Sequence, residues 1–461
     1  MRIDCDSIGD VELPKDALFS TSAFRAQENF AGLGPPVGAF PAFVRALARV
    51  KRAAARANLL AGALDTEIAN TIDQACAELI CGDHHRHMIV PLLEGSGGTS
   101  TNMNINEVIA NRAGQILGDP LGSFNRVHPN DHVNLSQSTN DVIPTAVKLT
   151  CIEVVDDLIQ EGNKLSNMFL RKAEEHEDVL RVGRTCMQAA QPMTYGQLFG
   201  GYASSISRAI AHLEQAQLGL RVVPLGGTAV GTGLGAVPGY HDHIVATLSG
   251  ELGFDISLSE DRFDGITTTD SFCRLSSEVK ILAETISKIA ADLVILSSDQ
   301  HSGLGEVILP QVQPGSSIMA GKVNPVICMA VQQVAYVIQG NDTTVSLAAL
   351  NGQMEINHFE PVIARALFNS IESLRQVTQL FRARCIEGLQ VNVERSYENL
   401  ATSTAISSLF LPVIGYKKVC ELVRIADLEK RPFVDVVIQE GLINKGNLDE
   451  LLRIAARPSS T

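Results

Sequence analysis

The chain has 461 residues, enough for about three domains or for one large core with smaller flanking units. Its 37 basic and 51 acidic residues give a formal net charge of −14, which argues against binding to nucleic acid or to an anionic membrane surface. Hydrophobic residues make up 45% of the chain, but no run of about 18 apolar residues occurs, so we expect a soluble protein.

Residues 1–38 carry Asp, Gly and Pro punctuation, so we predict an irregular lead-in. The first six residues are polar and acidic and lack the apolar core of a signal peptide, which favours the cytoplasm. The nine cysteines of the chain are scattered and include no Cys-x-x-Cys pair. We therefore expect mostly reduced core cysteines, without a zinc site or a disulfide framework.

Two helices are predicted next. The segment Phe40 to Ala63 is rich in Ala, Leu, Arg and Val, and a second helix is expected from Thr66 to Ile80. His84, His85 and His87 then follow in a polar turn. Clustered histidines could bind a metal, but no cysteine or carboxylate stands at ligand spacing, so we interpret the turn as a solvated loop and predict no metal site.

A string of hydroxyl and amide side chains occupies residues 97–107, Gly-Gly-Thr-Ser-Thr-Asn-Met-Asn-Ile-Asn-Glu. We expect a helix to start just after it. Backbone N–H groups and hydroxyls at a helix start form a seat for a carboxylate. An ordinary helix cap would explain Thr99 or Ser100, but not the whole polar run.

Two more polar strings follow. Residues 136–141, Ser-Gln-Ser-Thr-Asn-Asp, place Ser138, Thr139 and Asn140 just ahead of a helical stretch from about Val142 to Glu175. Residues 182–194, Val-Gly-Arg-Thr-Cys-Met-Gln-Ala-Ala-Gln-Pro-Met-Thr, form the other string.

The glycine-rich run at residues 226–235 could be taken for a phosphate loop. It lacks Gly-x-Gly-x-x-Gly spacing, a Walker lysine and a clear preceding strand, so the evidence for nucleotide binding is weak. Further on, apolar residues step by four and three, as in a helix packed in a bundle: Leu275, Val279, Leu282, Ile286, Ile289, Leu293 and Leu296. This stripe predicts a core or a subunit interface and implies no chemistry.

Residues 314–325, Pro-Gly-Ser-Ser-Ile-Met-Ala-Gly-Lys-Val-Asn-Pro, combine two glycines, two adjacent hydroxyls, one cation and one amide. That mixture suits a mobile loop closing over a small anion and is poor for a buried helix or strand. We therefore predict that this loop belongs to an active site.

After the loop, helices are expected at 326–349 and 359–381, and shorter ones at 418–427 and 432–440.

Together the strings resemble the fumarase/aspartase superfamily. The loop agrees with the superfamily signature Gly-Ser-Ser-Ile-Met-Pro-Gly/Ala-Lys-Val-Asn-Pro at ten of eleven positions, with Ala320 in place of proline. Residues 136–141 match the Ser-x-Ser-Thr-Asn-Asp box, and the glycine-rich run resembles a link between long helices. The 97–107 string and residues 338–357 resemble aspartases more than fumarases, which carry Gly-Thr-Gln-Ser-Asn at the first place.

The resemblance covers almost the whole chain and implies a mainly α fold with three domains. These are a mostly helical N-terminal domain at 1–134, a central long-helix bundle domain at 135–389 containing the signature loop 314–325, and a small C-terminal helical domain at 390–461. It also implies a homotetramer whose active sites each combine strings from three subunits, a small amino acid or dicarboxylate as substrate, and no cofactor.

The implied chemistry is elimination from a succinate-like substrate. Ser316 would act as an alkoxide base, so the loop must lower its pKa through nearby N–H groups and the Lys322 cation. The resulting dianion needs several fixed donors. The resemblance implies that one carboxylate of the substrate is bound by Lys322, Asn324 and Thr185. The activated carboxylate would be bound by Thr99, Ser138 and Thr139. The leaving amine would be bound by Asn140.

Two positions depart from the superfamily pattern. Cys186 stands where fumarases and some aspartases have histidine, and Met329 stands where many relatives have the glutamate paired with it. Loss of both the histidine and the glutamate is physically reasonable, because either residue, left buried without its partner, would destabilise the fold. Either the pair is dispensable, or Cys186 and Met329 form a less polar pocket wall for a bulkier amine, as in ergothionases. A nucleophilic Cys186 is a third reading, although elimination needs no covalent intermediate.

Four functions remain open. The leading hypothesis is a carbon–nitrogen lyase that releases ammonia from L-aspartate and forms fumarate. A lyase acting on a substituted amino acid is second, and a fumarate hydratase is third, disfavoured by the lost histidine–glutamate pair. A catalytically silent scaffold is disfavoured because Ser316, Lys322 and Asn324 are retained.

Overall fold

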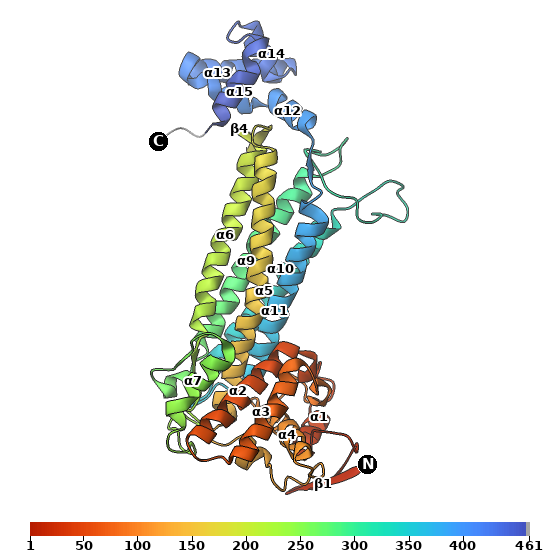
Figure 1. Cartoon of the computed structure of the whole chain (residues 1–461). Helices are drawn as coiled ribbons and strands as arrows, with labels where there is room; N and C mark the ends of the chain where they lie inside the picture. Colours follow the sequence, from red (N-terminus) through yellow and green to blue (C-terminus); the bar gives the residue numbers. More distant parts are fainter. Residues whose placement is uncertain (458–461) are drawn as a thin grey trace. The chain divides into compact units, whose positions relative to one another are not determined.

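The computed structural model describes residues 1–457, except the side chain of Lys445, and its fold is mainly α as predicted. Five long helices dominate (Figure 1): α5 (Thr139–Glu175), α6 (Tyr195–Gly219), α9 (Asp270–Leu296), α10 (Val326–Leu350) and α11 (Glu360–Phe381). Their predicted counterparts at 142–175, 326–349 and 359–381 are confirmed to within a few residues. No described helix is long and apolar enough to span a bilayer.

The chain forms two compact units, each containing segments of the five long helices. The first consists of Met1–Leu158, His212–Lys280 and Val337–Ser373, and the second of Ile159–Ala211, Ile281–Tyr336 and the chain from Leu374 onward. The three domains defined above divide the chain by sequence order and stay a prediction.

In the first unit, the predicted irregular lead-in is wrong. Strands β1 (Arg2–Asp6) and β2 (Gly9–Leu13) form an antiparallel hairpin, and α1 (Thr21–Asn29) follows. The buried Asp4 carboxylate accepts bonds from Arg2 and from Ser20 Oγ, the latter at 2.6 Å. Glu107 of α4 (Thr99–Ile116) accepts the N–H groups at the start of α1. The hairpin is local, with a two-residue turn between Asp6 and Gly9, and the punctuation there marked this turn; only Glu107, 87 residues from Ser20, is a distant partner.

Among the other helices of the first unit, α4 begins at Thr99, inside the 97–107 string, and the expectation that a helix starts just after the string is wrong. Helices α2 (Pro41–Leu60) and α3 (Thr66–Cys81) confirm the two predicted helices, and α7 (Tyr240–Leu252) packs on α2. The short elements are η1 (Val37–Ala39), η2 (His85–His87), η3 (Pro129–Val133), β5 (Val222–Val223), β6 (Ser257–Leu258) and α8 (Arg262–Thr267). All seven positions of the predicted α9 stripe are buried.

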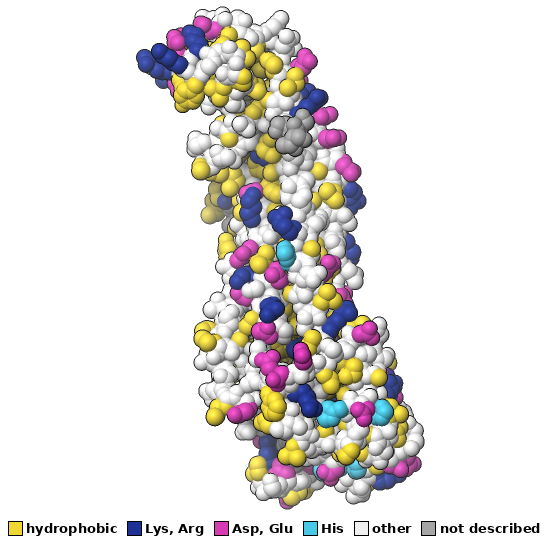
Figure 2. Space-filling model, turned by 90° about the vertical axis from the view of Figure 1, so that its left-hand side faces the viewer, with side chains coloured by type: hydrophobic (Ala, Val, Ile, Leu, Met, Phe, Trp, Pro, Cys, Tyr) yellow, Lys and Arg dark blue, Asp and Glu magenta, His cyan; other side chains and the backbone are white. Residues whose placement is uncertain are grey.

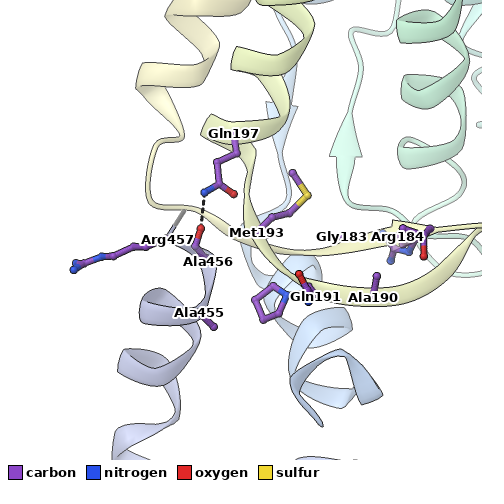
Figure 3. Close-up of a pocket in the computed structure, with 11 residues that line it drawn as sticks. Gly183, Arg184, Ala190, Gln191, Met193, Gln197, Ala455, Ala456 and Arg457 are labelled. Carbon is purple, nitrogen blue, oxygen red and sulfur yellow. Dashed lines mark hydrogen bonds between the residues drawn. The ribbon is translucent and has the colours of Figure 1, made fainter. Parts of the chain in front are cut away.

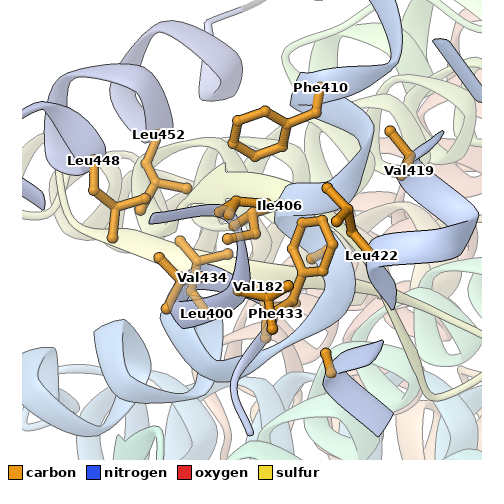
Figure 4. Packing of buried hydrophobic residues seen from close by; sticks show 14 of the residues in the cluster. Val182, Leu400, Ile406, Phe410, Val419, Leu422, Phe433, Val434, Leu448 and Leu452 are labelled. Atoms are coloured by element: carbon orange, nitrogen blue, oxygen red, sulfur yellow. The ribbon is translucent and has the colours of Figure 1, made fainter. Parts of the chain in front are cut away.

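The second unit carries a hairpin of β3 (Leu180–Thr185) and β4 (Gln188–Thr194) on a helical C-terminal part. That part consists of α12 (Val393–Thr402), η5 (Thr404–Phe410), α13 (Leu411–Glu429), α14 (Phe433–Gln439), η6 (Lys445–Asn447) and α15 (Leu448–Ala456). Val182 of β3 packs in one apolar cluster with Leu400, Phe433 and Leu452 (Figure 4). This core anchors the strand that ends at Thr185. Two further strands, β7 (Val307–Ile308) and β8 (Gln390–Val391), pair antiparallel, and η4 (Arg382–Ile386) follows α11.

On the face drawn in Figure 2, acidic and basic side chains are interspersed over the described residues. The absence of a nucleic-acid partner stays a prediction.

Candidate active site

Thr99 stands at the start of α4, held by a tight contact with α5. Gly98 has φ of 93°, and a Cβ there would lie 2.7 Å from Cγ1 of Ile143 on α5. Its N–H donates to Glu94 Oε1 at 2.7 Å, and the Ser100 N–H donates to Ser96 Oγ at 2.8 Å. Only glycine satisfies both the backbone angle and the close approach. The contact therefore joins the start of α4 to the first turn of α5.

The predicted Ser138–Asn140 box is held by Asp141, which is fully buried. Its carboxylate accepts the Ser138 N–H and the N–H groups of Gly226 and Thr228, each at 3.0 Å. Burial raises the pKa of Asp141 to about 7, while these N–H bonds and the Lys51 cation act in the opposite direction. The glycine-rich run therefore donates its N–H groups to a side chain of this protein, and it holds Ser138, Thr139 and Asn140 in place through Asp141.

Asn140 also contacts the glycine-rich run. Its Nδ2 donates to the Ala229 carbonyl at 2.7 Å, so the orientation of the amide is set, and Oδ1 remains an acceptor. Its backbone N–H donates to Ser138 Oγ at 3.3 Å. Thus the structure brings Ser138 and Asn140 together and orients the amide.

A buried polar cluster behind Thr139 was not found from the sequence. Lys51 Nζ on α2 donates to Asn134 Oδ1 at 2.9 Å, and Nδ2 of Asn102 and of Asn106 donates to the same oxygen, each at 3.2 Å. Asn102 Nδ2 also donates to Thr139 Oγ1 at 3.2 Å. The four-residue spacing of Asn102 and Asn106 was a visible signal of a shared helix face. Nothing in the sequence distinguished Lys51 from a surface lysine.

The signature loop of the second unit is closed on itself. Gly315 N–H donates to the Lys322 carbonyl at 2.8 Å, and Asn324 Nδ2 donates to the Gly315 carbonyl at 2.8 Å. Ser316 Oγ accepts the N–H groups of Ile318 at 3.1 Å and Met319 at 3.0 Å. Hydrogen bonds to an oxygen favour its charged form. The loop thus brings Ser316, Lys322 and Asn324 together and directs two donors at Ser316 Oγ.

Thr185 ends β3 at an exposed two-residue turn. Cys186 and Met187 occupy the turn with φ of 51° and 64°, the left-handed geometry that twisted hairpins favour but that non-glycine residues rarely adopt. Thr185 also lines a cavity of about 820 Å³ between the hairpin and the end of α15. There Gln197 Nε2 donates to the Ala456 carbonyl at 2.5 Å (Figure 3).

Glu306, just before β7, anchors the β3–β4 hairpin, and its role was not predicted from the sequence. Its side chain is fully buried and pairs with the Arg184 guanidinium, one bond being 3.0 Å, while Arg181 lies 3.7 Å away. Asn399 Nδ2 donates to the same carboxylate at 2.9 Å. A buried charge with several partners of this kind indicates a specific anchor, here for the residue beside Thr185.

The two departures from the superfamily pattern lie in different surroundings. Cys186 lines a cavity of about 440 Å³ whose walls include Met187, Met193 and Leu296. Met329 lies in the first turn of α10 with 45% of its side chain exposed. Whether the two share a pocket wall stays a prediction.

The three histidines each bond within the first unit. His84 Nε2 lies 2.8 Å from Glu78 Oε2, and His85 Nε2 lies 2.7 Å from the Leu79 carbonyl. Burial lowers the pKa of His87 to about 4, so it is neutral near pH 7. The turn is less solvated than expected. Within residues 1–457, His, Cys, Asp and Glu side chains do not form a group of three that could hold a metal.

The predicted site residues fall into two sets within one chain. Thr99 and the Ser138–Asn140 box belong to the first unit, and the signature-loop residues, Thr185, Cys186 and Met329 belong to the second. Each set is held by hydrogen bonds within its own unit. The assignment of both sets to one substrate stays a prediction.

The comparisons with known proteins agree with the motifs. A family model described as Lyase matches residues 10–340. Aspartate ammonia-lyase from Helicobacter pylori is 38% identical over 453 residues, covering 98% of this chain and 97% of that protein. Fumarate hydratase class II 1 from Pseudomonas aeruginosa is 36% identical over 455 residues, covering 98% and 97%.

Among solved structures, the cobalt-bound crystal structure titled fumarate lyase:delta crystallin from Brucella melitensis is similar with a TM-score of 0.96. It is 39% identical, and the match covers 99% of this chain and 100% of that chain. Because sequence and fold agree over nearly the full length, the chain belongs to the fumarase/aspartase family of lyases.

Proposed function

We propose that this enzyme is a carbon–nitrogen lyase that eliminates ammonia from L-aspartate and gives fumarate. The observation that carries the proposal is the pair of N–H donors on Ser316 Oγ, in the loop that also holds Lys322 and Asn324. An ordinary serine is far too weak a base, and these donors stabilise its alkoxide. Ser316 then removes a proton from the carbon beside one carboxylate.

The hydroxyls of Thr99, Ser138 and Thr139 stabilise the dianion that this step forms, while Lys322, Asn324 and Thr185 hold the other carboxylate. Preorganised donors of this type supply most of the stabilisation in such reactions. Asn140 supports ammonia as the leaving group. Since its Nδ2 is bound to Ala229, the free Oδ1 accepts a hydrogen bond from the substrate ammonium.

A lyase for a bulkier or substituted amine is the second candidate. Cys186 and Met329 present thiol and thioether groups where many relatives have a charged or strongly polar pair. The cavity beside Cys186 has apolar walls at Met187 and Leu296, and it is also lined by the cations of Arg181, Arg184 and Lys288, which suit a carboxylate. A fumarate hydratase is the third candidate, because the fumarate hydratase from P. aeruginosa is 36% identical to this chain.

Product analysis separates these candidates. Purified protein is incubated with L-aspartate, L-malate, N-substituted aspartates and betaines, and fumarate, other unsaturated acids and released amine are measured together. We expect fumarate and ammonia in equal amounts from L-aspartate. Amine release from substituted substrates alone would support the second candidate, and fumarate from L-malate alone the third. The absence of any unsaturated acid or released amine with all of these substrates would refute lyase activity.

The proposed assembly is a cytoplasmic homotetramer with shared active sites. One face of α10 leaves apolar side chains exposed in the single chain: Met329, Tyr336, Val337, Leu347 and Leu350, from 45% to 79%. An exposed stripe of this length is typical of a subunit interface. The division of the site residues between two units supports sites completed by other subunits.

Leu347→Glu is expected to break this assembly. A carboxylate in the middle of an apolar interface loses its hydration without gaining a partner, which costs several kcal/mol per interface. We expect light scattering to give about four times 49.4 kDa for the unmodified protein and a lower mass for the variant. Val413→Glu, at a 73% exposed position on α13, is the control and should keep the larger mass. Equal masses for the two variants would contradict the α10 interface.

A further inference from the structure

The Lys51 side chain is fully buried although its protonated form is a cation. Its Nζ donates to Asn134 Oδ1 at 2.9 Å, and Asp141 is the nearby charge that favours its protonated form. Burial acts against that form and lowers the pKa of Lys51 to about 7. Lysine is rarely buried without a specific purpose, because removing an ammonium from water is costly.

Two partners fix the direction of the amides behind Thr139. The Lys51 ammonium can donate but not accept, and Asn134 Nδ2 donates to the Gln137 carbonyl at 3.2 Å, so Asn134 turns its oxygen toward Lys51. Asn102 and Asn106 approach that same oxygen, each at 3.2 Å, and must therefore turn their Nδ2 groups to it.

The fixed direction reaches Thr139 through Asn102. The second hydrogen of Asn102 Nδ2 is donated to Thr139 Oγ1 at 3.2 Å. An oxygen that accepts on its inner side is left with its own hydrogen to donate elsewhere. Thr139 is 9% exposed, and no described residue accepts a hydrogen bond from its hydroxyl, so that hydrogen is without a partner within residues 1–457.

The arrangement has a cost that packing alone does not explain. Turning Nδ2 inward leaves Oδ1 of Asn102 and of Asn106 buried without a hydrogen-bond partner among the described residues. An unsatisfied buried acceptor costs about 1–3 kcal/mol. Such groups are rare in native proteins and require an explanation, for example a functional constraint.

We propose that Lys51, Asn134 and Asn102 act as a positioning relay that holds the Thr139 hydroxyl as a hydrogen-bond donor to the activated carboxylate of the substrate. This inference rests on the proposed lyase function. Lys51 and Asn102 both donate to Asn134 Oδ1, so the relay acts by fixing the orientation of the donor at Thr139, and a fixed donor is worth more in a medium of low dielectric constant. The relay therefore matters most when negative charge develops on the carboxylate, in the transition state.

Asn102→Asp is the sharpest test, because it keeps the shape of the side chain and reverses its polarity. A carboxylate can only accept, so the Thr139 hydroxyl turns inward to donate to it. Asn106→Asp is the matched control: it places the same charge beside Asn134 and does not contact Thr139. We expect Asn102→Asp to lower kcat by about 10²-fold, the effect of losing one oxyanion donor, with a smaller change in KM. We expect Asn106→Asp to lower kcat by less than about 5-fold.

A double-mutant cycle shows whether the effect passes through Thr139. Thr139→Val should lower kcat about as much as Asn102→Asp, and adding Asn102→Asp to Thr139→Val should cost less than about 3-fold more. Additive losses, or equal losses in Asn102→Asp and Asn106→Asp, would overturn the relay. Thermal melting of all variants, run in parallel, separates loss of fold from loss of the donor.

Fumarate binding, measured by calorimetry, distinguishes failure of the relay from failure of the proposed function. An unmodified protein that binds fumarate but releases no ammonia refutes the aspartate reaction, and the same cycle is then read in kcat for the substituted substrate whose amine is released. An active protein whose cycle is additive refutes the relay alone. A protein that shows neither activity nor binding refutes both.

Discussion

Replacing Ser316 by alanine is expected to abolish ammonia release while leaving the fold intact. The Oγ atom is the only group at this position that can take the substrate proton, and positioned bases contribute about 10²–10⁴-fold to such steps. Its two hydrogen bonds come from N–H groups of exposed loop residues, which water can satisfy after the substitution. We therefore expect kcat to fall by about that range, with melting unchanged within about 2 °C.

Ser317→Ala is the matched control, since the neighbouring hydroxyl lies in the same exposed loop. It should keep most of the activity. Steady-state amine release and fumarate affinity, measured on both variants, separate loss of the base from loss of binding. An inactive Ser317→Ala protein beside an active Ser316→Ala protein would move the role of base to the second serine.

Glu306→Ala is expected to have the largest effect on stability. Removing this carboxylate leaves the Arg184 and Arg181 cations in a buried place without their partner. Breaking a buried ion pair in this way costs about 3–5 kcal/mol in the free energy of unfolding. Arg184 directly precedes Thr185, so we also expect KM to rise.

Urea unfolding at a fixed protein concentration measures this effect, because oligomer stability depends on concentration. Glu306→Gln keeps an acceptor for Asn399 and should lose less than Glu306→Ala. Glu398→Ala is the control, since its pair with Arg395 is exposed and such pairs contribute about 0–1 kcal/mol. A Glu306→Ala protein as stable as the Glu398→Ala protein would show that Glu306 does not anchor the hairpin.

The signature loop is the part of the site most easily located from the sequence, and the roles of its residues stay predictions. The roles expected of Ser316, Lys322 and Asn324 depend on residue types within twelve positions, and the observed bonds among Gly315, Lys322 and Asn324 lie in the same segment. Predicted helices were likewise confirmed because periodic apolar residues act within one element. The predicted lead-in failed for two reasons: its punctuation residues surround the two-residue turn of a local hairpin, and the start of α1 is held by Glu107, 87 residues from Ser20.

By itself, the sequence determined the mainly α fold class, the long helices and the polar strings that mark the family, because these features depend on neighbours within a few residues. Only the tertiary structure decided which ordinary-looking charges became buried anchors. Lys51 meets Asn134 from 83 residues away, and Arg184 meets Glu306 from 122 residues away. Burial and the identity of a charge's partner arise when distant segments pack together, so no local pattern could specify them.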